Sequence, residues 1–238
     1  MSLVSKIQSL ITACNATTGQ SRTDLTSGVQ DLVDGYGGSS VTKGLVFSEY
    51  DSDGYPHKAE FVGSWTSIPD YFLAMMSTND YKFMNYITHI DVPEGVTSIG
   101  GGVFRNQNSY GLTSISLPST LTSIGNTGVS MAYCTSLEVP SGVTQLGVDS
   151  FALLYRCEQI TFLGDITSVA RYAIERTGQN ASSLTIDFSH CTSVPTLENA
   201  NAFANTPAKV FKVPQSLLST WQTETNWVGV TNVTWVGV

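Results

Sequence analysis

Apolar and polar positions alternate over short segments in the middle of the chain, and these segments return at nearly constant intervals. The pattern is clearest in three segments that end in glycine and begin at Val96, Leu121 and Val143, so that their spacings are 25 and 22 residues. A weaker copy begins at Ile166, 23 residues after Val143. Alternation with a period of two places successive side chains on opposite faces of a strand. Recurrence every ~20–50 residues indicates a solenoid, in which each unit is too small to bury its own apolar face.

A second set of short alternating segments lies upstream of the first. These segments are residues 90–93, 115–118, 137–140, 160–163 and 184–187. Proline ends the first three of them, because it cannot donate the next hydrogen bond of a strand ladder. The glycine that closes each downstream segment is expected to turn the chain with positive φ. Apolar residues four positions beyond the glycine are expected to fill the coil interior, namely Phe104, Val129, Phe151 and, by alignment, Ile174.

Residues 112–125, LTSISLPSTLTSIG, resemble the BspA-type leucine-rich repeat, whose units read approximately LTSIxLPxxVTSIGxxAFxxCxx. The resemblance covers about residues 62–215. It implies a leucine-rich-repeat solenoid, a right-handed superhelix of short parallel β-strands and turns with irregular units of 22–25 residues. Residues 65–69 and 194–197 look like worn copies of the downstream segment.

The flanks of the repeats predict four further segments. Apolar residues at helical spacing predict a helical hairpin over residues 1–34, and the glycine-rich stretch that follows predicts a flexible linker over 35–43. An Asp-Gly turn predicts a β-hairpin over 44–62 that covers the first repeat edge. The repeats then occupy 63–213, and a short helix and a strand over 214–238 cap the other end, as is common in the BspA-type family.

The first 35 residues or so resemble N-terminal modules of phage and prophage tail structural proteins, of the form KIxxLIxAxNATTGxSDxDLTxAVQxLxxGYG. This resemblance implies an assembly or attachment device. It makes oligomerisation through the N-terminal helices an expectation.

Composition excludes some classes of partner. The net charge of −8 would repel a phosphate backbone, so we expect no nucleic-acid binding. No stretch approaches the roughly 18 consecutive apolar residues of a membrane span. The N-terminus does not read as a signal peptide, and removal of a leader before this start stays open.

Chemistry-bearing residues do not form a recognisable catalytic or metal motif. The histidines, His57, His89 and His190, lack metal-ligand spacing, and no nucleophile elbow is present. The segment Asp51-Ser52-Asp53-Gly54 resembles the start of a calcium loop, but the expected bidentate glutamate is Val62, so a turn is the better interpretation. We therefore expect a non-enzymatic protein with no catalytic residues, no metal and no cofactor.

The four cysteines are too scattered for a disulfide framework. Cys134 and Cys157 each lie three residues before an inward strand position, where the preceding unit has Leu112. A place that accepts leucine or cysteine is an apolar packing place, so free, buried thiols are expected. A disulfide between the two cysteines is the alternative, because neighbouring units would bring them together.

The outward side chains of the upstream strands are the candidate ligand-binding site. A stacked parallel sheet would present them as one long polar face. They are His89, Asp91, Ser114, Ser116, Ser136, Glu138, Gln159 and Thr161. Trp227 and Trp235 offer an aromatic alternative, although packing in the cap explains them better.

Two functions are implied by the resemblances. The BspA-type repeat implies a bacterial, extracellular cell-surface adhesion or binding protein with a protein or glycan partner. The N-terminal module implies a phage or prophage tail-associated structural or receptor-binding protein of a virion.

Overall fold

The computed structural model describes residues 44–73, 86–104, 111–130 and 132–238. The chain divides into two compact units, Met1–Val46 with Phe61–Ser64, and Phe47–Glu60 with Trp65–Val238. Only residues 44–46 and 61–64 of the first unit are described, and the predicted helical hairpin and linker lie outside the described residues. The second unit holds the repeats.

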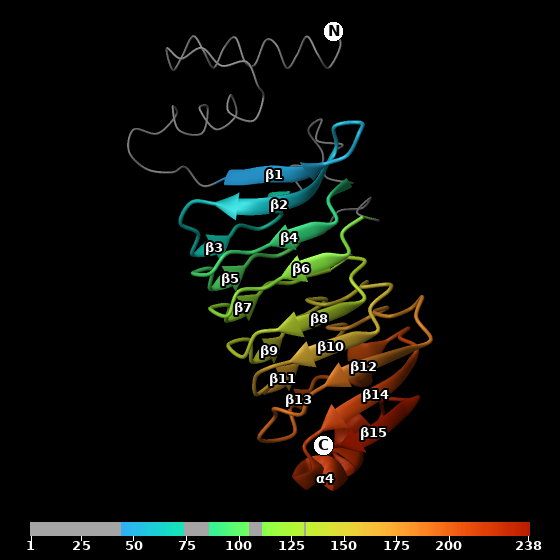
Figure 1. Cartoon of the computed structure of the whole chain (residues 1–238). Coiled ribbons are helices and arrows are strands. Elements are labelled where there is room, and N and C mark those ends of the chain that lie inside the picture. Colours follow the sequence, from blue (N-terminus) through green and yellow to red (C-terminus); the bar gives the residue numbers. More distant parts are fainter. Residues whose placement is uncertain (1–43, 74–85, 105–110, 131) are drawn as a thin grey trace, which may run out of the picture. The chain divides into compact units, whose positions relative to one another are not determined.

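Each repeat unit forms one coil of the solenoid. The longer strands of successive coils form two sheets, which we together call the long ladder (Figure 1). The first has the order β1-β2-β4-β6, with bounds Gly44–Tyr50, Pro56–Val62, His89–Asp91 and Ser114–Ser116. The second has the order β15-β14-β12-β10-β8, with bounds Val233–Gly237, Ala208–Val213, Ser183–Asp187, Gln159–Phe162 and Ser136–Val139. From β2 to β6 and from β8 to β15, neighbouring strands pair in parallel.

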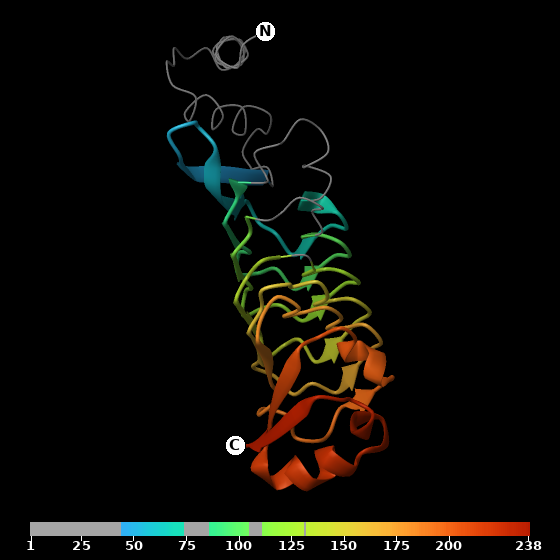
Figure 2. The same cartoon turned by 90° about the vertical axis from the view of Figure 1, so that its right-hand side faces the viewer.

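Two-residue strands form a second ladder across the core from the first (Figure 2). They are β3 (Ser67–Ile68), β5 (Ser98–Ile99), β7 (Ser123–Ile124), β9 (Gln145–Leu146), β11 (Ser168–Val169) and β13 (Thr196–Leu197). They too pair in parallel with their neighbours within two sheets, β3-β5-β7 and β13-β11-β9. Each coil therefore contributes one longer and one shorter strand, which is the alternation that the sequence predicts.

The core consists of equivalent apolar side chains stacked coil on coil. The predicted interior residues Phe104, Val129, Phe151 and Ile174 are all 2% exposed or less. The residues that open the downstream segments are equally buried, namely Val96, Leu121, Val143 and Ile166. Stacking identical positions removes apolar surface that no single coil could cover, so the coils stabilise one another.

Threonines connect adjacent coils just before the short strands. The backbone N–H and the hydroxyl of one threonine both donate to the carbonyl oxygen of its counterpart in the preceding coil. The donor and acceptor pairs are Thr97 and Thr66, Thr122 and Thr97, Thr167 and Thr144, and Thr196 and Thr167. These bonds connect the backbones of adjacent coils at exposed positions just before the short strands, and each adds a modest contribution to stability.

The repeat glycines have a different role from the expected one. Gly100, Gly125 and Gly147 do not adopt positive φ, so the prediction of a left-handed turn at these positions was wrong. Instead, a Cβ at Gly125 would lie 2.6 Å from the backbone nitrogen of Gly101 in the preceding coil. Glycine therefore permits close approach of two coils. The fourth unit has Ala170 at this place and keeps the same hydrogen bond to the preceding coil.

Short helices and the last strand close the C-terminal end (Figure 1). One helix was expected after Val213, but the structure has η3 (Gln215–Leu217), α4 (Leu218–Thr223) and α5 (Thr225–Val228). The break between α4 and α5 falls at Glu224, whose ψ of 131° is extended. It lets both Trp221 and Trp227 reach the core, where each is completely buried.

The predicted β-hairpin turn lies between β1 and β2. Oδ1 of Asp51 accepts hydrogen bonds from the backbone N–H groups of Asp53 and Tyr55, and Gly54 has a φ of +82°. The carboxylate thus caps the turn, as an Asx turn does. Within the ranges described above, no helix is long and apolar enough to cross a membrane.

Candidate functional site

The eight outward residues predicted from the sequence lie on the solvent side of the long ladder, where they are exposed or half-buried. Their order follows from strand register. His89 and Asp91 pair with Ser114 and Ser116, and Ser136 and Glu138 pair with Gln159 and Thr161. Because parallel neighbours lie about 4.8 Å apart, equivalent side chains form two rows that run across the strands. We call this surface the ladder face.

The N-terminal part of the ladder face is a charged cluster. Nζ of Lys58 lies 2.7 Å from the Glu60 carboxylate and 3.2 Å from that of Asp91, and Nε2 of His89 lies 2.8 Å from Oδ1 of Asp91. Partial burial alone would raise the pKa of Asp91, but hydrogen bonds from Ser116, His89 and Lys58 lower it. Hydrogen bonds to Glu60 and Asp91 raise the pKa of Lys58. These groups are already paired, which leaves little charge for a ligand.

At the centre of the ladder face, the acidic side chain is not paired with a basic one among the described residues. Glu138 is exposed, and within the described part of the chain no cationic side chain forms an ion pair with it. Its register partner Thr161 accepts a hydrogen bond from Nε2 of Gln159 at 3.0 Å. The centre therefore offers one free carboxylate beside hydroxyl and amide groups.

The eight predicted residues do not reach either end of the ladder face, although the strand at 184–187 was predicted. Lys58 and Glu60 pair in register with His89 and Asp91, but they were assigned only to the hairpin. At the other end, β12 and β14 add further outward residues, which are Thr185, Asp187, Val210 and Lys212. The alternating pattern of residues 208–213 was the sequence signal that could have identified β14.

The remaining histidines do not join the ladder face or a metal site. His57 lies 3.4 Å from the Asp51 carboxylate in the hairpin, and His190 is exposed beside Ser189. Among the described residues, no group of three or more His, Cys, Asp or Glu side chains is placed to hold a metal ion.

Three cysteines are buried as free thiols in the core, namely Cys134, Cys157 and Cys191. Cys14 lies outside the described residues. Cys134 and Cys157 occupy equivalent places in adjacent coils, two residues before the register partners Ser136 and Gln159. A hydrogen bond with the Cys134 sulfur, together with burial, raises the pKa of Cys157. Burial, assisted by nearby carboxylates, raises the pKa of Cys191 to about 11.

A hydrogen bond with Cys157 lowers the pKa of Cys134, so its inertness cannot rest on protonation. All three thiols are nevertheless buried, and we expect them to be inert in the folded protein because a reagent cannot reach them. In a Cys14→Ser background at pH 8, iodoacetamide should leave the native mass unchanged and should add three groups after denaturation in urea. The denatured sample is kept without a reducing agent, because a disulfide would then stay intact and its two sulfurs would not react. A mass two hydrogens lower and only one added group would contradict free thiols at 134 and 157.

Comparison with known proteins agrees with the repeat architecture. The BspA type leucine rich repeat region matches residues 75–209 in 6 copies. The chain belongs to the BspA-type leucine-rich repeat family. This match includes the coils from β4 to β12, and it does not extend to the first 35 residues, which carry the likeness to phage tail modules.

Another similarity of this BspA-type protein is to a solved structure. A leucine rich cell surface protein from Faecalibacterium prausnitzii A2-165, determined by crystallography at 1.80 Å resolution, shares 15% sequence identity with it. The alignment covers 73% of this chain and 70% of that chain, with a TM-score of 0.34. No curated protein matches the chain at a significant level.

Proposed function

We propose that the protein is a non-enzymatic recognition protein that binds a protein partner across the ladder face. The observation that carries the proposal is the register of β4 with β6 and of β8 with β10, which aligns polar side chains in two rows. Within each of the two sheets the parallel pairing fixes the relative positions of these side chains, so little conformational entropy is lost on binding. Extended surfaces of this kind are how repeat proteins bind partners.

The chemistry of the face favours a partner with a basic side chain. Glu138 is the acidic group near the middle of the rows without an ion pair among the described residues, and hydroxyl and amide groups surround it. A lysine or arginine of the partner would meet this carboxylate, and the net charge of −8 would assist its approach. A glycan partner is the second candidate, favoured by the hydroxyls and the Gln159 amide, which suit sugar hydroxyls.

Display at the bacterial cell surface is part of the proposal, supported by membership of the BspA-type family. The right-handed sense of the superhelix, the boundaries of the flanking segments and oligomerisation through residues 1–34 stay predictions. A role in a phage tail rests on the N-terminal resemblance alone.

The test begins with site-specific crosslinking. A photoreactive amino acid at position 138 should capture a bacterial or host surface protein that the same group at Gln145, on the short ladder, does not capture. The captured partner should then bind Glu138→Lys at least about tenfold more weakly than the unmodified protein, since a charged contact becomes repulsive. Gln145→Lys, an exposed position of β9, is the matched control and should bind normally. Equal affinity of all three proteins would reject the ladder face as the binding surface.

A further inference from the structure

Lys209 is a charged residue at an inward position of the long ladder. Burial alternates along β14 so that Lys209, Phe211 and Val213 face the interior. Its register partners are Leu184 on one side and Val233 on the other, which are apolar. Lys209 is nevertheless only 4% exposed. Lysine is almost never buried to this degree unless it is paired.

The ammonium group of Lys209 is incompletely matched by its surroundings. Nζ donates to Oγ1 of Thr206 at 3.1 Å and to the carbonyl oxygen of Pro207 at 3.2 Å. No carboxylate within the described ranges forms an ion pair with it. Burial consequently lowers the pKa of Lys209. One of the three ammonium hydrogens has no acceptor in these contacts, and the positive charge has no counter-ion.

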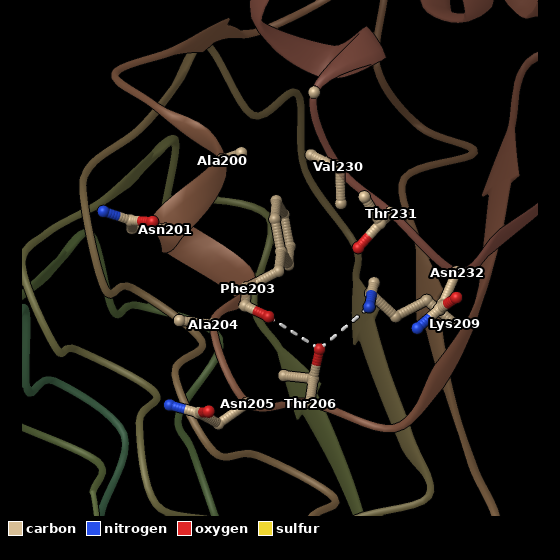
Figure 3. Close-up of a pocket in the computed structure, with 11 residues that line it drawn as sticks. Ala200, Asn201, Phe203, Ala204, Asn205, Thr206, Lys209, Val230, Thr231 and Asn232 are labelled. Carbon is tan, nitrogen blue, oxygen red and sulfur yellow. Dashed lines mark hydrogen bonds between the residues drawn. The ribbon is translucent and has the colours of Figure 1, made fainter.

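A pocket lies beside this group, between η2 (Ala200–Phe203) and the segment that precedes β15 (Figure 3). Its volume is about 320 Å³. The Lys209 side chain, the Thr206 hydroxyl and the amides of Asn205 and Asn232 line it together with the apolar side chains of Phe203 and Val230. The pocket thus combines one cation with several neutral hydrogen-bonding groups, and its surface is mainly polar because Phe203 and Val230 are themselves buried.

We propose that this pocket binds an acidic monosaccharide, with the carboxylate of the sugar on Lys209. The Asn232 amide and the Thr231 hydroxyl line the pocket and are complementary to ring hydroxyls. The Asn205 amide and the Thr206 hydroxyl are less available, because they already donate to Glu175 and to the Phe203 carbonyl oxygen. A single ammonium group without arginine matches the single charge of a carboxylate better than the double charge of a phosphate ester. A volume of about 320 Å³ lies at the lower end of the range for small-molecule sites.

This pocket is separate from the ladder face. Lys209 lies on the inward side of β14, whereas Lys212 of the same strand lies on the outward side near Asp187. The two sites are therefore testable independently. A protein partner on the ladder face is neither required nor excluded by a sugar in the pocket.

The experiment is calorimetric titration of the whole chain with D-glucuronate and D-galacturonate. At least one acid should bind, and its methyl ester and the corresponding neutral hexose should bind at least about tenfold more weakly, because they lack the carboxylate. Binding of neither acid, or equal binding of acid and ester, would overturn the proposal. These arms use the unmodified protein and do not depend on a variant that folds.

A pair of lysine variants locates the site. Lys209→Met should weaken binding of the acid at least about tenfold while its melting temperature stays equal or rises, because an uncompensated buried charge is removed. Lys212→Met should bind normally. Full affinity of Lys209→Met would place the ligand elsewhere and reject the pocket. Should Lys209→Met fail to fold, Asn232→Gly replaces it: it removes a lining amide, tolerates the φ of +56° at this position, and should weaken binding without loss of the fold.

Discussion

Replacing Trp227 by alanine should lower the free energy of unfolding by about 3–5 kcal/mol, the usual cost of deleting a buried aromatic ring. Trp227 is fully buried in the C-terminal cap, and its ring lies 4.5 Å from that of Trp221 and 5.8 Å from that of Phe211. The substitution would leave a large cavity where the last coil is closed. Urea titration followed by circular dichroism measures the loss.

The two cap tryptophans provide a matched control for this prediction. Nε1 of Trp227 donates to the carbonyl oxygen of Pro195 at 2.8 Å, whereas Nε1 of Trp221 is buried without a partner among the described residues. Trp227→Phe should therefore be more destabilising than Trp221→Phe, by about 1–2 kcal/mol, since only the first leaves a carbonyl unsatisfied. Equal losses would show that packing alone determines the contribution of both rings.

Gly125→Ala should destabilise the protein by about 1–3 kcal/mol, the range for overpacking a core. The new Cβ would lie 2.6 Å from the Gly101 nitrogen and 2.8 Å from the Gly100 carbonyl carbon. Both atoms belong to the backbone of the preceding coil, so no side-chain rotation can relieve the contact. The melting temperature and the urea midpoint should both fall.

Gly147 stands at the equivalent place in the next unit and serves as the control. A Cβ there would lie 3.5 Å from Oδ1 of Asn126, an ordinary contact. Gly147→Ala should thus be neutral, or should stabilise by up to about 1 kcal/mol through the smaller entropy of the unfolded chain. A loss as large as that of Gly125→Ala would mean that coil spacing does not explain the repeat glycine.

The repeating part of the fold was predictable because its signal is local. Alternation around Ile90, Ile160 and Ile186 determines which side chains point inward, and the structure buries all three. Register between coils follows once the repeats are aligned, so Gln159 and Ser136 were correctly placed as neighbours. Whether the ladder face binds a partner stays a prediction.

Other features depend on contacts that no local pattern discloses. Glycine is needed at position 125 because the backbone of the preceding coil lies too close for a side chain. The sequence suggested only the commoner explanation for a glycine in a turn, which is a positive φ. Lys209 was missed because a lysine in an alternating strand is normally expected on the outward side. Its inward position follows from the pairing with Leu184, which sequence spacing alone did not reveal.

Constant register between coils has an evolutionary consequence. Leu137 pairs with Ile160, so removal of residues 137–159 would join Ser136 directly to Ile160 and would leave an inward apolar residue after an outward polar one. The corresponding duplication would add a coil in the same way. Recombination between repeats within the gene can therefore lengthen or shorten the ladder face one coil at a time, while both caps and their closing contacts are inherited unchanged.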